Sequence, residues 1–353
     1  MNKKLLTLAV GAALAAGMSV AQAEVTVYGK AHVSVDYQDN DAGVEEAFIS
    51  DNSSRFGVRA NEDLGGGLKA LAQWEIGART DVNSGLSTNR NSFLGLASDA
   101  MGTIRVGKYD TPYKEIGRKA DLFNERVGDS RNVIGLGSSD GAFDARVSNM
   151  VRYDSPSFGG LKVAALYSAD EGNTAGAIAN SYRSASVSYQ GGPVFAALGY
   201  EEHSSPLTLD NETGIRLGVG FKTGALTVNA LYETLSDIDN TATDPGSDVD
   251  NYGVGAAFKF GNATAKAQYF LSDTGDLNFD SELMAVGLDY AFSKTVTGYI
   301  VYAQADNDLS AVLLGEDTHT NAASGNGGHG DFFAHDTVGE SPSAISVGVE
   351  MNF

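Results

Sequence analysis

The last eleven residues of the chain, Ser343 to Phe353, alternate strictly between two kinds of side chain. One face is apolar, with Ile345, Val347, Val349, Met351 and Phe353. The other face is small or polar, with Ala344, Ser346, Gly348, Glu350 and Asn352. Period-two alternation is the signature of a β-strand with one apolar face and one wet face. A strand that runs on to a terminal Phe favours a closed barrel in a membrane, where the last strand must pair with the first.

The same alternation recurs along the chain in about sixteen segments. We expect strands near 25–36, 53–61, 68–76, 90–97, 103–108, 146–153, 161–167, 182–190, 194–201, 214–222, 225–235, 251–259, 263–271, 282–290, 295–305 and 343–353. Short turns alternate with longer polar loops, the first of them near 40–52, as in an up-and-down outer-membrane barrel. The expected fold class is all-β, a 16-stranded antiparallel transmembrane β-barrel. The alternative, a soluble sandwich, would need two bulky apolar inner faces, whereas the wet faces here carry Lys, Arg, Gln, Ser and Gly.

The first 23 residues have the pattern of a secretory signal peptide. Lys3 and Lys4 precede an apolar run from Leu5 to Val20, and Ala21-Gln22-Ala23 forms a cleavage site. We therefore expect residues 1–23 to be removed, leaving 353 − 23 = 330 residues, 24–353, as a single barrel domain. No later stretch has the roughly 18 to 20 consecutive apolar residues that a spanning helix needs. With no Cys, the fold uses no disulfide.

The mature chain is strongly acidic. Removal of the two signal-peptide lysines leaves 22 basic and 45 acidic residues, a net charge of −23. Such a chain is a poor candidate for binding nucleic acid. The acids and His residues of the last loop, 306–342, match no known metal-ligand spacing, so we expect a solvated acidic loop. Divalent cations shared with lipopolysaccharide phosphates are a hypothesis for such loops, and no cofactor is expected.

The stretch from about 109 to 145 breaks the alternation. It holds many charges of both signs among apolar residues such as Tyr113, Ile116, Phe123 and Phe143. A loop of this length is uncommon unless it is functional. A loop folded back into a barrel needs apolar anchors on the inner wall, whereas a free external loop does not. We therefore expect 109–145 to enter the barrel, with a short helix between Pro112 and Phe123.

Several short motifs occur together in order along the chain. They are Val27-Tyr28-Gly29-Lys30, Ser54-Arg55-Phe56-Gly57, the run from Glu62 to Ala70, Ser92-Phe93-Leu94-Gly95-Leu96, Gly102 to Lys108, Val151 to Pro156, and Phe353. With the signal peptide, this set resembles the Gram-negative general porins. The resemblance implies a sixteen-stranded barrel in the cell outer membrane, a homotrimer, and passive diffusion of small hydrophilic solutes. By the same analogy, the loop at 79–89 would contact a neighbouring subunit.

The resemblance also implies a pore constriction, in which loop carboxylates face a row of basic wall residues. The family pattern places the basic wall at Lys30, Arg55, Arg90 and Arg146, and alternation independently places three of these away from lipid. Arg59 and Arg152 share that face and are secondary lumen residues. For the acidic side we nominate Asp121, Glu125 and Asp129. Opposed charges across a narrow aqueous gap would set a transverse field that favours polar solutes.

These features predict a water-filled diffusion channel that weakly favours cations, because loop and vestibule acids dominate the charge count. A solute-specific porin and a plugged adhesive or structural barrel remain alternatives. An enzyme is not expected, since none of the five His residues has a catalytic partner identifiable from spacing.

Overall fold

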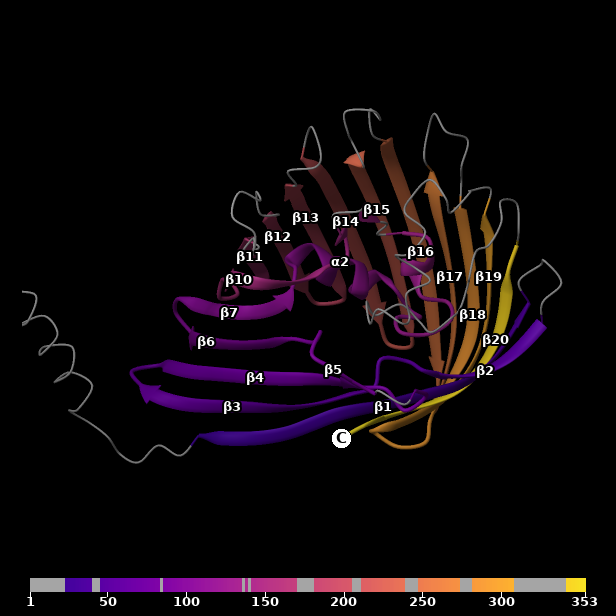
Figure 1. The fold of residues 1–353 in the computed structure, drawn as a ribbon, viewed down its shortest axis with the longest axis horizontal. Coiled ribbons are helices and arrows are strands. Elements are labelled where there is room, and N and C mark those ends of the chain that lie inside the picture. Colours follow the sequence, from indigo (N-terminus) through magenta and orange to yellow (C-terminus); the bar gives the residue numbers. More distant parts are fainter. Residues whose placement is uncertain are drawn as a thin grey trace, which may run out of the picture.

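The computed structural model describes residues 23–39, 45–82, 85–134, 137–138, 141–169, 181–204, 211–238, 247–273, 281–307 and 341–353. One antiparallel sheet contains eighteen strands (Figure 1). Its strands are β1 (Glu24–Asp39), β2 (Glu45–Asp51), β3 (Arg55–Gly65), β4 (Leu68–Ala78), β5 (Leu86–Ser87), β6 (Ser92–Ser98), β7 (Gly102–Asp110), β10 (Arg146–Asp154), β11 (Leu161–Ala169), β12 (Ser181–Gly191), β13 (Val194–Ser204), β14 (Glu212–Thr223), β15 (Leu226–Ile238), β16 (Ser247–Phe260), β17 (Ala263–Asp273), β18 (Ser281–Ala291), β19 (Val296–Asn307) and β20 (Ser343–Asn352).

The sheet closes into a barrel of sixteen wall strands. β2 and β3 occupy one position beside β1, and β5 and β6 occupy one position beside β4, so eighteen segments make sixteen. β20 pairs with β1 from Lys30↔Asn352 to Asp39↔Ser343, which closes the ring. The predicted sixteen-stranded antiparallel barrel and its closure by the last strand are confirmed.

The terminal residue takes part in this closure. The Phe353 amide donates to the Gly29 carbonyl at 3.0 Å, and the Gly29 amide donates to the Phe353 carbonyl at 2.8 Å. A Cβ at position 29 would lie 2.4 Å from the Phe353 ring and 2.8 Å from the Arg55 carbonyl oxygen. Only glycine therefore fits where the ends of the sheet meet.

One segment differs from its predicted structure. Residues 40–52 were expected to form a loop, but Glu45–Asp51 is a strand that pairs with Val33–Asp39 of β1. Its composition, Glu-Glu-Ala-Phe-Ile-Ser-Asp, is a weak strand signal. Backbone pairing with the long first strand outweighs local propensity there.

The two faces of the wall differ as the alternation predicts. Outward side chains are exposed and mostly apolar, for example Val27, Trp74, Leu94, Val163, Leu198, Val254, Ile300 and Val347. The lumen face carries polar and charged groups, for example Lys30, His32, Glu75, Arg216, Glu233 and Gln268. An apolar outer belt with a polar interior is the pattern of a membrane-spanning barrel. In the part of the chain that the structure describes, no helix is long and apolar enough to cross a membrane.

After β7 the chain enters the barrel and returns at β10, and we call the described residues between 111 and 145 the constriction loop. It contains the helix α2 (Pro112–Ala120), the short 3₁₀ helix η1 (Ser130–Asn132), and the strands β8 (Gly137–Ser138) and β9 (Gly141–Ala142). α2 begins where the Thr111 hydroxyl accepts a hydrogen bond from the Lys114 amide, with Pro112 in the first turn. α2 lies inside the ring of strands and contacts β11 to β16 (Figure 1).

The apolar residues of the constriction loop are its anchors. Tyr113, Ile116, Phe123, Val127, Val133, Ile134 and Phe143 are all buried. Phe123 and Val127 pack with Leu283, Ala285 and Val301 of the wall, far along the chain from the loop. The predicted inward loop and its short helix are therefore confirmed.

Candidate pore constriction

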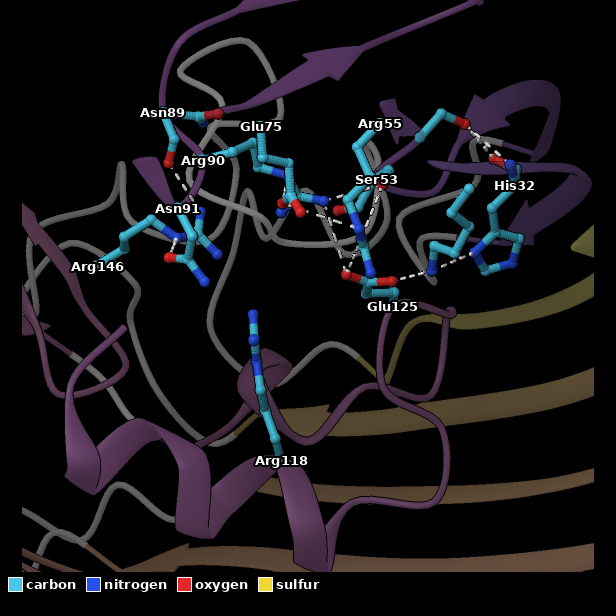
Figure 2. A network of polar contacts seen from close by, with 12 residues as sticks. His32, Ser53, Arg55, Glu75, Asn89, Arg90, Asn91, Arg118, Glu125 and Arg146 are labelled. Atoms are coloured by element: carbon cyan, nitrogen blue, oxygen red, sulfur yellow. Dashed lines mark hydrogen bonds and ion pairs between the residues drawn. The ribbon is translucent and has the colours of Figure 1, made fainter. Parts of the chain in front are cut away.

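Glu125 lies at the meeting point of the constriction loop and the opposite wall (Figure 2). Its carboxylate pairs with Lys30, lies 2.7 Å from Arg55 Nη1 and 3.9 Å from Arg90 Nη2, and is almost buried. Burial alone would raise the pKa of Glu125, but the positive charges of Lys30, Arg55 and Arg90 hold it well below its usual value. Glu125 is therefore a permanent anion at neutral pH.

The backbone at Glu125 is unusual. Its φ of 61° lies in the left-handed region, which costs a non-glycine residue roughly 1–2 kcal/mol. The Asp129 carboxylate holds this turn by accepting the Glu125 amide at 2.7 Å. Strained backbone at a contact residue indicates that its surroundings require one orientation, here with the carboxylate directed at the wall.

On the part of the wall that Glu125 contacts, acidic and basic side chains alternate. Glu75 on β4 lies 4.0 Å from Arg55 Nε and 3.5 Å from Arg90 Nε. Both guanidinium groups also donate to the Ser53 carbonyl, at 3.0 and 2.9 Å. Ser53 itself has a φ of 64°, so a second left-handed residue shapes this wall (Figure 2).

The stem of the constriction loop carries a second group of charges around Asp110. Arg146 reaches this carboxylate at 3.0 Å and also donates to Asn91 Oδ1 and to the Asn89 carbonyl, both at 2.8 Å. Arg118 lies 3.2 Å from Asp110 and projects from α2 toward the wall cations (Figure 2). A β-bulge between Val147 and Met150 shifts the alternation, so Arg146 reaches the site through these contacts and not through simple strand parity.

Further ion pairs extend from the stem. Lys114 lies 3.1 Å from Asp144, and burial lowers the pKa of Lys114 to about 8 against the opposing effect of Asp144. Arg131 lies 3.6 Å from Asp144 and 2.6 Å from Asp129, so its guanidinium group links these two carboxylates. Burial would raise the pKa of Asp144, but the cations Lys114, Arg131 and Arg216 hold it below its usual value.

The other two nominated carboxylates, those of Asp121 and Asp129, have partners other than the basic wall residues. Asp121 accepts from Gln268 Nε2 at 2.9 Å on β17, and from the Ser130 amide and hydroxyl at 3.0 and 3.1 Å. Burial and the neighbouring Asp129 raise the pKa of Asp121. Asp129 pairs with Arg131 and caps the turn at Glu125. Of the three nominees, Glu125 is the one that meets all of Lys30, Arg55 and Arg90.

The two secondary basic residues have their own partners. Arg59 donates to Gln73 at 3.0 Å, and its guanidinium lies 3.8 Å from the centre of the Tyr28 ring. Arg152 pairs with Glu115 of α2 at 2.8 Å and with Asp154 at 2.7 Å. Both residues therefore lie on the lumen wall as their alternation predicts, but in contacts separate from Glu125.

Comparison with known proteins gives the family. The family model described as Gram-negative porin matches residues 7–310. The chain belongs to the Gram-negative porins. Outer membrane porin protein 32 of Delftia acidovorans is 28% identical over 370 aligned positions, with 100% of each chain covered. Major outer membrane protein P.IB of Neisseria gonorrhoeae is 29% identical, with 85% of this chain and 92% of the relative covered.

Solved structures agree on the barrel. The anion-selective porin from Comamonas acidovorans has a TM-score of 0.78 at 25% identity, covering 94% of this chain and 100% of that one. OmpT of Vibrio cholerae, with a TM-score of 0.69 and 16% identity over 94% and 99%, shows the fold alone. The predicted family and outer-membrane location of this porin are thus confirmed.

Several site residues were not nominated from the sequence. Glu75 shares the lumen face of its strand with Lys69 and Gln73, so alternation could have found it. Asp110 and Arg118 lie where no alternation applies. The acidic last loop, with His319, His329 and His335, lies outside the described residues, and binding of divalent cations or lipopolysaccharide there stays a prediction.

Proposed function

We propose that this porin forms a water-filled channel for passive diffusion of small hydrophilic solutes and ions, and that its narrowest part prefers anions. The observation that carries the proposal is which charges face the lumen. The side chains of Arg55 and Arg118 are 25% and 29% exposed, whereas those of Glu75, Glu125 and Asp110 are 10%, 8% and 4% exposed. These three carboxylates lie behind the guanidinium groups, and the more exposed Glu115 of α2, at 40%, is paired with Arg152, so an ion passing Arg55 and Arg118 meets positive charge first.

The number of charged side chains around the constriction also supports a preference for anions. The wall network joins three cations to two carboxylates, a net charge of +1: Lys30, Arg55, Arg90, Glu75 and Glu125. The stem network joins five cations to four carboxylates, again +1: Lys114, Arg118, Arg131, Arg146, Arg216, Asp110, Asp129, Asp144 and Glu233.

This proposal replaces the weak cation preference expected from the total acid count. Salt screens exposed charges beyond about 8 Å at physiological ionic strength, so acids on distant loops have less influence than groups at the gap. One relative of 25% identity is described as anion-selective, which supports the same sign. We propose no catalytic activity.

The test is the reversal potential of the purified porin in a planar bilayer under a KCl gradient. We expect conductance with the sign of chloride preference. Arg55→Gln with Arg118→Gln should shift the reversal potential toward cations, while Arg183→Gln, an exposed outward pair with Glu202, should not. A folded barrel without conductance would overturn the channel, and cation preference in the wild type would overturn the proposed sign.

We also propose that the porin assembles as a homotrimer, as its family resemblance implies. The loop between β4 and β6 supports this, because Val82 and Leu86 are 43% and 70% exposed at its surface. Exposed apolar side chains on a polar loop favour contact with another protein surface.

A further inference from the structure

A buried ion pair on the far wall joins the two ends of the constriction loop. Arg216 of β14 is 1% exposed and pairs with Glu233 of β15, which is fully buried. We propose that Arg216 and Glu233 form a clasp that holds the loop against this wall and so sets the cross-section of the pore. The proposal rests on the channel function proposed above.

The clasp contacts both ends of the loop directly. Arg216 Nη1 donates to the Tyr113 carbonyl at 3.4 Å, and Arg216 Nη2 donates to the Phe143 carbonyl at 3.1 Å. These two residues are thirty positions apart, one at the start of α2 and one just before β10. A single side chain thus joins the outgoing and returning parts of the loop.

Glu233 completes the clasp from the neighbouring strand. It accepts the Tyr113 hydroxyl at 2.9 Å and the Asn251 amide at 2.7 Å. The guanidinium of Arg216 also lies 4.2 Å from the centre of the Tyr113 ring. The charges of the clasp are therefore well supplied with partners, as a buried pair requires.

Glycines in the wall make room for the loop beside the clasp. A Cβ at Gly214 would lie 2.8 Å from both the Phe143 ring and the Tyr113 hydroxyl. A Cβ at Gly218 would lie 2.7 Å from Ile116, and so would one at Gly199. These glycines on the inner face of the wall therefore form the surface against which α2 packs.

The position of the constriction loop and the ion selectivity of the pore can be tested separately. Both clasp residues lie on the inner face of the wall but are covered by the loop, whereas the side chains of Arg55 and Arg118 are partly exposed. Loss of the clasp should therefore widen or loosen the constriction while the exposed guanidinium groups of Arg55 and Arg118 stay in place. Arg216 and Glu233 are positioning residues in this sense.

The first test is Arg216→Met, with Arg183→Gln as the control for loss of an arginine. In folded barrels, checked by heat-dependent gel mobility and far-UV circular dichroism, we expect single-channel conductance to rise about twofold, since it follows the narrowest cross-section. Open-channel noise should rise with it, while the sign of the reversal potential stays the same. Glu233→Gln should act in the same direction. Unchanged conductance and noise in folded Arg216→Met would overturn the proposal.

The second test leaves every charge in place. Gly214→Ala should displace Tyr113 and Phe143 and reproduce the larger, noisier conductance. Gly298→Ala of β19 is its control, because the three atoms nearest to a Cβ there all belong to the wall residue Phe292 and none belongs to the constriction loop. If Arg216→Met does not fold, the conductance and noise of Gly214→Ala become the test of the clasp. Wild-type conductance and noise in folded Gly214→Ala would then count against the clasp.

A third readout does not depend on conduction. Hydrogen–deuterium exchange in the folded porin should be slow across α2 in the wild type and faster in Arg216→Met and Gly214→Ala. If the wild type does not conduct but these differences appear, the channel proposal fails while the clasp stands. If exchange is the same in all variants, the clasp fails whatever the channel does.

Discussion

At the scale of single residues, Glu125 is the most informative side chain of the constriction. It combines a left-handed backbone, near-complete burial and three cationic neighbours. Removing one partner from a buried ion pair typically costs about 3–5 kcal/mol, because the remaining charges are left without compensation. The residue therefore ties the loop to the wall and also neutralises part of the basic cluster.

Glu125→Gln should make the pore more selective for anions. The substitution raises the net charge of the wall network from +1 to +2. We expect the chloride-to-potassium permeability ratio to rise about two- to fivefold, which corresponds to an effect on the order of 1 kcal/mol. Reversal potentials under a KCl gradient measure this, with Glu202→Gln at the outer rim as a control. No shift, or a shift toward cations, would show that the charge of Glu125 does not influence the permeating ion.

The pH dependence of this effect follows from the depressed pKa of Glu125. A carboxyl group whose folded-state pKa is lowered contributes stability above its unfolded value of about 4.3, and loses it only as pH falls through the folded value. The difference between wild type and Glu125→Gln should therefore persist from pH 7 down to pH 4. Exposed loop acids titrate equally in both proteins, so their effect cancels. Loss of the difference near pH 5 would mean that the cations do not hold Glu125 ionised.

At the scale of elements, the barrel depends on the contact between its first and last strands. β1 is the longest strand described, and it pairs with β20, β2 and β3 along different parts of its length. At this junction two backbone hydrogen bonds join Gly29 to Phe353. The Phe353 ring fills the space that a side chain at position 29 would need.

Gly29→Ala should impair closure. The added methyl group would meet a ring atom at 2.4 Å and a backbone oxygen at 2.8 Å, and the backbone cannot move without breaking the ladder. Overpacking of this kind costs roughly 1–3 kcal/mol. We expect a smaller fraction of heat-modifiable, folded barrel after refolding, while Ala31→Ser, two residues on along the same outward face but at an exposed position, refolds like the wild type. Equal yields for both variants would show that the junction tolerates a side chain.

The constriction loop is the other element with a distinct physical basis. Its charges alone would leave it solvated, but its apolar side chains are buried against the wall and its ends are held by Arg216. Apolar anchoring gives the loop a fixed position, and the ion pairs then determine which charges face the gap.

At the scale of the whole molecule, the segment between β4 and β6 bears on the oligomeric state of the porin. Val82 and Leu86 are exposed on the loop between β4 and β6. In a homotrimer this loop would contact a neighbouring subunit, and its apolar side chains would then be covered.

Leu86→Asp should weaken the trimer without preventing the barrel from folding, because the side chain makes little contact within its own chain. We expect wild-type porin to run as a trimer in mild detergent by light scattering, and Leu86→Asp to shift toward monomer. Circular dichroism and heat-dependent mobility should stay unchanged. A monomeric wild type would contradict the predicted trimer.

The sequence by itself determined the barrel. Strand faces, about sixteen strands, closure through Phe353 and an inward loop at about 109–145 all follow from local alternation and its interruption, which are visible within a few residues. The same reasoning placed Lys30 and Arg55 in the lumen. It failed at 45–51, where pairing with a long neighbour outweighs weak local preference, and its parity did not extend through the β-bulge between Val147 and Met150, next to Arg146.

Only the tertiary structure decided which charges meet. Glu125 and Lys30 are 95 positions apart, and Arg216 is 103 positions from Tyr113, so no local period links them. The total charge of the chain suggested cations, but the charge at the gap depends on which groups are covered and which are exposed. That property arises when a loop packs against a distant wall, because burial and pairing are set by contacts between residues far apart in the sequence.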